Sequence, residues 1–295
     1  MDIAKHRYLY LMALPVLAYY IIFCYLPIYG AQIAFKNFVP GLGILGSPWA
    51  GLTHFKAFFG SVYFGRILGN TLLISFYSLI FSFPMPIILA LLLNEVKSKW
   101  FKSTVQTLSY LPHFISLVVV CSIIREFTAS GGAINQIIRL LGGTPRTMLL
   151  VPELFRPIYI ISEIWQEIGW GSIIYLAALS GIDPTYYDAA VVDGAGRWRR
   201  MWNVTLPGIM PTIVILLILR LGQVMSVGFE KIILLYSPSI YETADVISSF
   251  VYRKGLLEQG YSYSAAVGLF NSVINFVLVV TANTISRRVN ETSLW

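Results

Sequence analysis

Long apolar runs separated by short polar segments are the dominant pattern of this chain. A membrane-spanning helix rises 1.5 Å per residue through about 30 Å of hydrocarbon, so it needs about 20 mostly apolar residues. We expect six transmembrane helices, over residues 8–35, 67–93, 104–124, 158–179, 209–235 and 264–285. Open strands would leave backbone groups unpaired in lipid, and the runs lack the alternation of barrel strands. The pattern therefore predicts an all-α membrane protein with a single transmembrane domain over residues 1–295.

The composition supports this membrane assignment. Hydrophobic residues make up 57% of the 295 residues and charged residues only 12%, and the mean hydropathy is +0.71. The formal charge of +7 is dispersed in short pieces between the apolar runs, whereas a nucleic-acid-binding face would gather it. Cys24 and Cys121 both lie inside apolar runs, where buried thiols are expected. We expect contact with membrane lipids and none with nucleic acid.

The basic residues predict the orientation, because the cytoplasmic flanks of membrane helices carry an excess of Lys and Arg. The first apolar run is too long for a signal peptide, so we expect an uncleaved first span. If the N-terminus is cytoplasmic, the inner flanks hold Lys5, Arg7, Lys97, Lys99, Lys102, Arg197, Arg199, Arg200, Arg287 and Arg288. The outer side holds as many basic residues, but they are spread through longer loops. Six spans then place both termini, and the loop over residues 181–207, in the cytoplasm.

That loop has a local sequence typical of two short helices joined at an elbow. Asp183 and Pro184 are a helix cap and a first-turn proline, so residues 184–193 are expected to be helical. The glycines of Gly194-Ala195-Gly196 end this helix, and a second helix over residues 197–204 is expected to end before Pro207. The exposed apolar side chains of such a pair favour either docking into a partner's groove or anchoring on lipid headgroups.

The same residues resemble the cytoplasmic EAA loop of permease subunits from binding-protein-dependent ABC importers. That motif has the form E-A-A-x-x-D-G-A, five variable residues, then F-x-x-I-x-L-P. The spacing is intact here, with matches at Ala189, Ala190, Asp193, Gly194, Ala195, Leu206 and Pro207. Asp188 replaces Glu, Met201 replaces Phe and Val204 replaces Ile, so charge or apolar character is kept at all three departures.

The resemblance extends beyond the loop to most of the last 110 residues. Residues 227–256 and 271–295 are similar to the LplB-like polysaccharide permeases of the sugar importer group, and the first half matches in layout. The resemblance implies a type I ABC importer permease fold (MetI-like or MalF-like) in the bacterial plasma membrane. It implies a second homologous permease, two cytoplasmic ATPase subunits and an extracellular solute-binding lipoprotein as partners.

The resemblance also assigns a role to the loop, which would dock on an ATPase subunit and transmit its motion to the spans. Gly194 would form the turn between the two coupling helices, with an apolar plug beside it and charged residues around it. The implied ATPase-coupling residues are Tyr187, Asp188, Ala189, Ala190, Val191, Asp193, Gly194, Ala195, Arg197 and Arg199. Alternatively, Asp188 and Asp193 only cap helix ends and contact solvent.

No enzymatic activity is expected of this chain. It contains no G-x-x-x-x-G-K-[ST], so ATP and magnesium would be bound by the partner ATPase subunits. The histidines are far apart, and neither H-E-x-x-H nor C-x-x-C occurs, so no cofactor or metal is expected.

Polar residues inside the spans are candidates for the substrate path, because charge in the hydrocarbon is costly and usually faces an interior or a cavity. The candidates, which share helix faces by their spacing, are Glu163, Glu167, Trp170, Tyr175, Arg220, Gln223, Glu230, Asn271 and Asn275. Aromatic rings among them could stack on sugars. The alternative is structural: Arg220 would pair with Glu163 or Glu167, and the asparagines would join helices by hydrogen bonds.

The resemblance thus implies a permease that imports oligosaccharides by alternating access. Arg220, Lys231 and His113 would suit an acidic sugar, although structural cations would look the same. The loops over residues 37–65 and 127–157 are long enough to contact a binding protein or to cap the helix ends. An ion-coupled secondary transporter and a membrane scaffold are the alternative functions.

Overall fold

The computed structural model describes residues 7–290 and is almost entirely helical. The only pairing of extended residues in this range is an isolated bridge between Lys36 and Trp49. The chain forms two compact units. Within the described range, one consists of residues 7–64 and Phe250–Asn271, and the other of Gly65–Ser249 and residues 272–290.

The first unit begins with a long apolar helical segment. Helix α1 (Arg7–Tyr20) continues through a π turn (Ile21–Tyr25) into a 3-10 helix (Leu26–Phe35). This segment, Tyr8–Phe35, is apolar enough to cross a membrane. Nearly all of its large apolar side chains are exposed in the chain, as expected of a helix that faces lipid or a partner.

The rest of the first unit packs around one aromatic side chain. Short helices α2 (Gly43–Gly46) and α3 (Thr53–Phe59) follow the first segment, and the first turns of α16 (Tyr261–Asn290) belong to the same unit. Phe58 of α3 is fully buried, and its ring lies 5.1 Å from Phe64 and 5.4 Å from Phe270 between centroids. Edge-to-face contacts of this kind join segments that are far apart in sequence.

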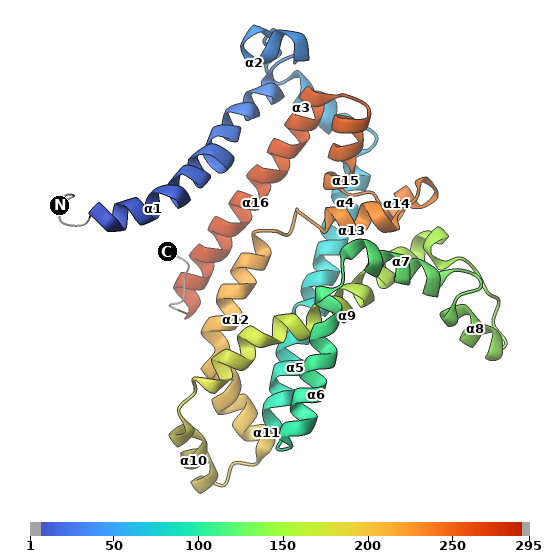
Figure 1. Cartoon of the computed structure of the whole chain (residues 1–295). Coiled ribbons are helices and arrows are strands. Elements are labelled where there is room, and N and C mark those ends of the chain that lie inside the picture. Colours follow the sequence, from blue (N-terminus) through green and yellow to red (C-terminus); the bar gives the residue numbers. More distant parts are fainter. Residues whose placement is uncertain (1–6, 291–295) are drawn as a thin grey trace. The chain divides into compact units, whose positions relative to one another are not determined.

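The second unit holds the remaining helices, shown by colour along the chain in Figure 1. They are α4 (Phe64–Tyr77), α5 (Pro84–Glu95), α6 (Lys99–Tyr110), α7 (Leu117–Thr128), α8 (Ala133–Leu140), α9 (Pro152–Ser180), α10 (Pro184–Val192), α11 (Arg197–Arg200), α12 (Leu206–Leu221), α13 (Phe229–Leu235) and α14 (Tyr241–Ala244). Helix α15 (Ile247–Tyr252) begins in the second unit, and its residues from Phe250 onward belong to the first. A π turn, Ser78–Ser82, joins α4 to α5 as one continuous helix.

The third expected span is broken rather than continuous. A 3-10 turn (Leu111–Phe114) separates α6 from α7, so neither helix alone reaches the roughly 20 residues of a span. Pro112 explains the break, because it lacks an N–H for the ladder and clashes with the preceding turn. Ser116 then restarts the helix by accepting a hydrogen bond from the Val119 N–H at 3.4 Å.

The fifth expected span, residues 209–235, is wrong at both ends. Helix α12 stops at Leu221, and residues 222–228 form a non-helical segment between Gly222 and Gly228 before α13 begins. At the other end, the second helix of the elbow does not end before Pro207. A π turn, Met201–Thr205, joins α11 to α12 directly, so the helical path continues through Pro207 in the first turn of α12.

Five segments of the described chain are long and apolar enough to cross a membrane: Tyr8–Phe35, Phe64–Glu95, Leu117–Leu140, Arg197–Leu221 and Tyr261–Arg287. The segment Leu117–Leu140 combines α7, α8 and the turn between them, whereas the third span was expected to end at residue 124. Helix α9 has 29 residues but is more polar, with Glu163 and Glu167 in its middle. The sixth span and the single-domain organisation stay predictions, as does the cytoplasmic location of the termini, whose residues 1–6 and 291–295 lie outside the described range.

Helix α9 is the packing centre of the second unit and lies beside α5 and α6 (Figure 1). Gly169 allows its close contact with α6, because a Cβ atom at this position would clash with the Ser109 carbonyl oxygen. Gly171 similarly lies against Pro86 of α5. Small residues at such crossings let helix backbones approach closely, as they do in other membrane helix pairs.

We expect Gly169→Ala to destabilise the protein by about 1–3 kcal/mol, because the added methyl group forces α6 and α9 apart. The measurement is the midpoint of thermal unfolding in detergent. Gly69→Ala is the matched control, since a Cβ atom at Gly69 of α4 would meet no described atom within 4 Å. Equal midpoints for the two variants would contradict this role of Gly169.

Candidate functional site

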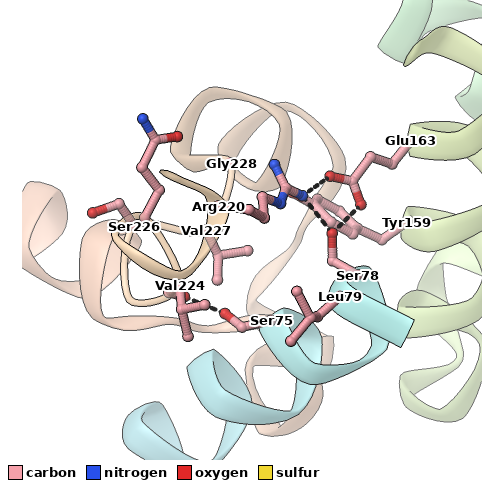
Figure 2. A pocket seen from close by; sticks show the side chains of 11 residues that line it. Ser75, Ser78, Leu79, Tyr159, Glu163, Arg220, Val224, Ser226, Val227 and Gly228 are labelled. Carbon is pink, nitrogen blue, oxygen red and sulfur yellow. Dashed lines mark hydrogen bonds and ion pairs between the residues drawn. The ribbon is translucent and has the colours of Figure 1, made fainter. Parts of the chain in front are cut away.

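A polar cavity of about 220 Å³ lies within the second unit, between α4, α9, α12 and the segment over residues 222–228. Figure 2 shows the side chains that line it. The residues are Ser75, Ser78, Leu79, Tyr159, Glu163, Arg220, Gln223, Val224, Ser226, Val227 and Gly228. A neighbouring cavity of about 370 Å³ shares Glu163, Arg220 and Gln223 with it. Polar residues of three helices therefore border two adjacent cavities.

An ion pair between Arg220 and Glu163 is at the centre of this region. One terminal guanidinium nitrogen of Arg220 donates to Glu163 Oε1 and to Ser78 Oγ, each at 2.6 Å. Glu163 Oε2 accepts hydrogen bonds from Ser78 Oγ at 2.6 Å and from Ser82 Oγ at 2.9 Å. Both carboxylate oxygens are thus occupied, which offsets the cost of keeping a largely buried charge in an apolar surrounding.

The π turn over Ser78–Ser82 places the two serines on this carboxylate. The Phe83 N–H donates to the Ser78 carbonyl at 3.0 Å, five residues back instead of the four of an α-helix. Such a widened turn arises in an otherwise regular helix and often marks a functional site. Here it directs the hydroxyls at positions 78 and 82 to a single oxygen of Glu163.

Arg220 retains unused hydrogen-bonding capacity. Its guanidinium group carries five N–H donors, and only one of its nitrogens donates to described residues. The side chain is 42% exposed, whereas that of Glu163 is 16% exposed. The remaining donors therefore border the cavity, where they could bind a carboxylate in a forked arrangement.

The segment over residues 222–228 is held in its non-helical form by two other helices. Asn275 of α16 accepts a hydrogen bond from the Met225 N–H at 3.0 Å and donates to Ser226 Oγ at 3.0 Å. Ser75 of α4 donates to the Val224 carbonyl. Backbone groups freed by the break in the helix are thus satisfied by side chains, as buried irregular backbone in a membrane protein requires.

Glu167 faces the neighbouring cavity and pairs with His113 rather than with Arg220. The His113 Nδ1 atom lies 3.0 Å from Glu167 Oε2. The imidazole also stacks on the Trp170 indole, with ring centroids 4.5 Å apart and planes 4° from parallel. Trp170 is 43% exposed, although the Phe114 ring also contacts it edge-on at 5.5 Å between centroids. Tyr175 lines the same neighbouring cavity.

The structure thus brings together only part of the predicted path. Glu163, Arg220 and Gln223 line the first cavity, and Glu163, Arg220, Gln223, Glu167 and Tyr175 the second. Asn275 contacts the irregular segment instead of lining either cavity, and Trp170 and Glu230 line neither. Asn271 belongs to the other unit. The prediction that Arg220, Gln223 and Glu230 share a helix face is wrong, because residues 222–228 are not helical.

Sequence reasoning missed four lining or bracing side chains: Ser75, Ser78, Ser82 and Tyr159. The three serines had a detectable signal, since they recur at intervals of three and four residues within an otherwise apolar run. Tyr159 had a weaker one. It lies four residues before Glu163, on the same face of α9.

A second candidate site is the helix elbow over residues 181–207. The Asp183 carboxylate accepts a hydrogen bond from the Thr185 N–H at 2.9 Å, and this cap holds the pKa of Asp183 below its ordinary value. Helix α10 then runs from Pro184 to Val192, as expected. Gly194 follows with a φ angle of +72°, a conformation that side chains other than glycine rarely adopt.

The surface of this elbow is largely exposed. Val191 is 53% exposed, Val192 is 88% exposed and Trp198 is 73% exposed. Asp188, Ala189, Asp193, Arg197 and Arg199 are exposed as well, whereas Tyr187, Ala190 and Ala195 are partly buried. Tyr187 donates a hydrogen bond to Thr205 Oγ1 at 3.1 Å, which fixes α10 to the π turn before α12. An exposed apolar surface on a braced helix pair is suited to docking.

Comparisons with known proteins match nearly the whole chain. Residues 82–291 match the model of the family described as binding-protein-dependent transport system inner membrane component. The polygalacturonan/rhamnogalacturonan transport system permease protein YteP of Bacillus subtilis (strain 168) is 46% identical over 99% of this chain and 91% of the relative. Protein LplB of the same organism is 44% identical over 99% of this chain and 92% of the relative.

Solved structures of bacterial ABC transporters also match nearly the whole chain. A chain in the crystal structure of a bacterial alginate ABC transporter, in complex with an alginate pentasaccharide-bound periplasmic protein, superposes with a TM-score of 0.93. The two chains are 47% identical, and the match covers 99% of this chain and 98% of the other. A further crystal structure of a bacterial ABC transporter for import of alginate matches with a TM-score of 0.92 and 48% identity.

Proposed function

Because this chain belongs to the family of binding-protein-dependent transport system inner membrane components, we propose that it carries acidic oligosaccharides across the membrane past Arg220. The chain is a permease subunit of a sugar-transporting ABC importer, a non-enzymatic component with a MetI-like permease fold. Its relatives are named for polygalacturonan, rhamnogalacturonan and alginate, all of which contain uronic acid units. A substrate with several carboxylates is the chemistry they have in common.

The exposed guanidinium group of Arg220 is the observation that carries this proposal. It borders both cavities, and Glu163 is the only other charged residue in the lining of the first. Glu163 occupies one nitrogen of Arg220, and the remaining donors are available to a sugar carboxylate. A charged hydrogen bond in a region of low dielectric is strong enough to select for acidic sugars, and a neutral sugar would leave those donors unpaired.

The second cavity offers contacts to a sugar ring in addition to the charged groups that line it. Glu167 lines it and could accept hydrogen bonds from sugar hydroxyls, while Trp170 beside it presents a partly exposed indole. Flat apolar faces of sugars pack on aromatic rings, with polar groups fixing their orientation. We assign these two residues, with Tyr175, to contacts with the uncharged part of the oligosaccharide.

The elbow over residues 181–207 would couple this path to ATP hydrolysis. It joins α9, which carries Glu163, to α12, which carries Arg220, so a displacement of the elbow moves both sides of the cavity. We propose that it docks on an ATPase subunit in the cytoplasm, and that α9 is the sixth span. The complete importer would contain a second homologous permease, two ATPases that bind ATP and magnesium, and an extracellular solute-binding lipoprotein.

The proposal predicts preferential uptake of acidic oligosaccharides. A strain deleted for this gene and complemented with it should take up labelled trigalacturonate, and unlabelled trigalacturonate in excess should reduce that uptake at least about tenfold. The carboxyl-reduced trisaccharide, which has the same size but no charge, should compete much less. Equal competition by the two compounds would contradict a path selective for acidic sugars.

A further inference from the structure

We propose that the Tyr159 hydroxyl is a second substrate-binding group, which donates a hydrogen bond to the sugar unit whose carboxylate Arg220 binds. The inference rests on the proposed function and adds a specificity-determining residue that the charged groups alone do not reveal. Tyr159 lies on α9 one turn before Glu163 and lines the first cavity. Figure 2 shows it beside Arg220 and Ser78, at the same end of the cavity.

The hydroxyl group of Tyr159 has no partner within residues 7–290. The residue is only 3% exposed, and its hydroxyl forms no hydrogen bond with the described chain. The hydroxyl oxygen is not one of the fully enclosed polar atoms that lack a partner in the described chain, and the residue lines the cavity, so the oxygen is accessible from there. Phenylalanine would fill the same volume without this polar group. A polar group that lines a cavity and has no protein partner can fix the orientation of a bound ligand.

The ring that carries this hydroxyl is held in place on its other sides. It belongs to the apolar core of the second unit, and the Phe155 ring lies 6.2 Å from it between centroids. The Lys231 ammonium group lies 5.2 Å from the centre of the Tyr159 ring and is buried, with no hydrogen bond to the described residues. A cation on the ring face is attracted to the ring and adds positive potential near it. An anionic sugar gains from that potential.

The segment over residues 222–228 ends in a glycine that lies next to the Tyr159 hydroxyl. Gly228 lines the same cavity, and a Cβ atom at this position would overlap the Tyr159 hydroxyl oxygen. The next nearest atom, the ring carbon that bears the oxygen, would be 3.5 Å away, which is an ordinary contact. A methyl group at position 228 would thus overlap the hydroxyl oxygen and only touch its other neighbours, so glycine preserves the space next to this oxygen.

Two substitutions that act on the same oxygen provide the test. Tyr159→Phe removes the oxygen and leaves the packing, so we expect uptake of trigalacturonate at saturating binding protein to fall about tenfold. Gly228→Ala places a methyl group against the oxygen and should reduce uptake to a similar degree. The double variant should be no worse than Tyr159→Phe alone, because the methyl group no longer meets an oxygen. Tyr77→Phe, a partly buried tyrosine outside both cavities, is the control and should be unchanged.

The outcomes separate this inference from the proposed function. Normal uptake by Tyr159→Phe, in a preparation where Arg220→Gln abolishes uptake, overturns the role of the hydroxyl and leaves the acidic path intact. Normal uptake by both Tyr159→Phe and Arg220→Gln overturns the proposed path for acidic sugars itself. Additive losses in the double variant would show that Gly228 acts through the backbone rather than through Tyr159, and would count against the inference. Thermal unfolding of each variant excludes loss of folded protein as the cause.

Discussion

Arg220→Gln is expected to reduce uptake of acidic oligosaccharides about 100-fold. The substitution removes the group proposed to bind the sugar carboxylate and leaves Glu163 as an unpaired charge that repels an anionic substrate. Truncating one member of a hydrogen-bonded charge pair typically costs 2–5 kcal/mol, roughly 30- to 1000-fold in an equilibrium constant. Uptake of labelled trigalacturonate by the complemented deletion strain is the measurement, with Arg139→Gln on exposed α8 as the control.

A double variant separates binding from a structural ion pair. Arg220→Gln combined with Glu163→Gln removes both charges, and the amide at position 163 can still contact Ser78 and Ser82. If Arg220 binds the substrate, the double variant stays impaired for acidic sugars and loses its preference over the carboxyl-reduced compound. If the pair is only a bridge between α9 and α12, removing both charges restores uptake. Restored uptake would therefore rule out substrate binding by Arg220.

Gly194→Val is expected to uncouple ATP hydrolysis from transport. A β-branched residue is strained at the φ angle of +72°, so the turn between α10 and α11 must open and the docking surface must change shape. We expect stimulation of ATPase activity by loaded binding protein to fall at least about tenfold in the assembled importer, while basal hydrolysis by the ATPase subunits persists. The measurement is the ATPase rate with and without loaded binding protein in proteoliposomes.

Gly196 offers a matched control two residues away. It has a φ angle of −69° in an extended conformation, and a Cβ atom at either glycine would meet no described atom within 4 Å. Gly196→Val changes the same loop by the same side chain but without backbone strain, so stimulation should be largely kept. Equal loss in both variants would indicate that added volume, rather than the conformation at Gly194, disturbs the elbow.

Cross-linking tests the location of the elbow independently of its conformation. Val192 is 88% exposed at the end of α10, and a cysteine placed there in a cysteine-free background should cross-link to an ATPase subunit. Leu45, which is 80% exposed in α2, is the control position and should give no such product. Labelling of the cysteine at position 192 from outside the cell would contradict the proposed cytoplasmic docking.

The sequence alone determined where three of the long apolar segments form and what class of protein the chain is. Apolar runs of sufficient length predicted Tyr8–Phe35 at the residues observed, and the segments Phe64–Glu95 and Tyr261–Arg287 to within a few residues. Asp183, Pro184 and Gly194 predicted the first helix of the elbow and its turn, and the EAA spacing indicated the family. These features depend on hydrophobic length, capping and backbone conformation, which are local properties of the chain.

Only the tertiary structure decided how polar residues inside the helices are paired. The sequence left Arg220 with Glu163 or Glu167 as partner, and the structure pairs it with Glu163, while Glu167 contacts His113. It also showed that residues 222–228 are not helical and that Asn275 holds them, because side chains from other helices satisfy the backbone groups there. Periodicity along one helix cannot reveal a π turn or a partner across a helix interface, because both depend on contacts between segments distant in sequence.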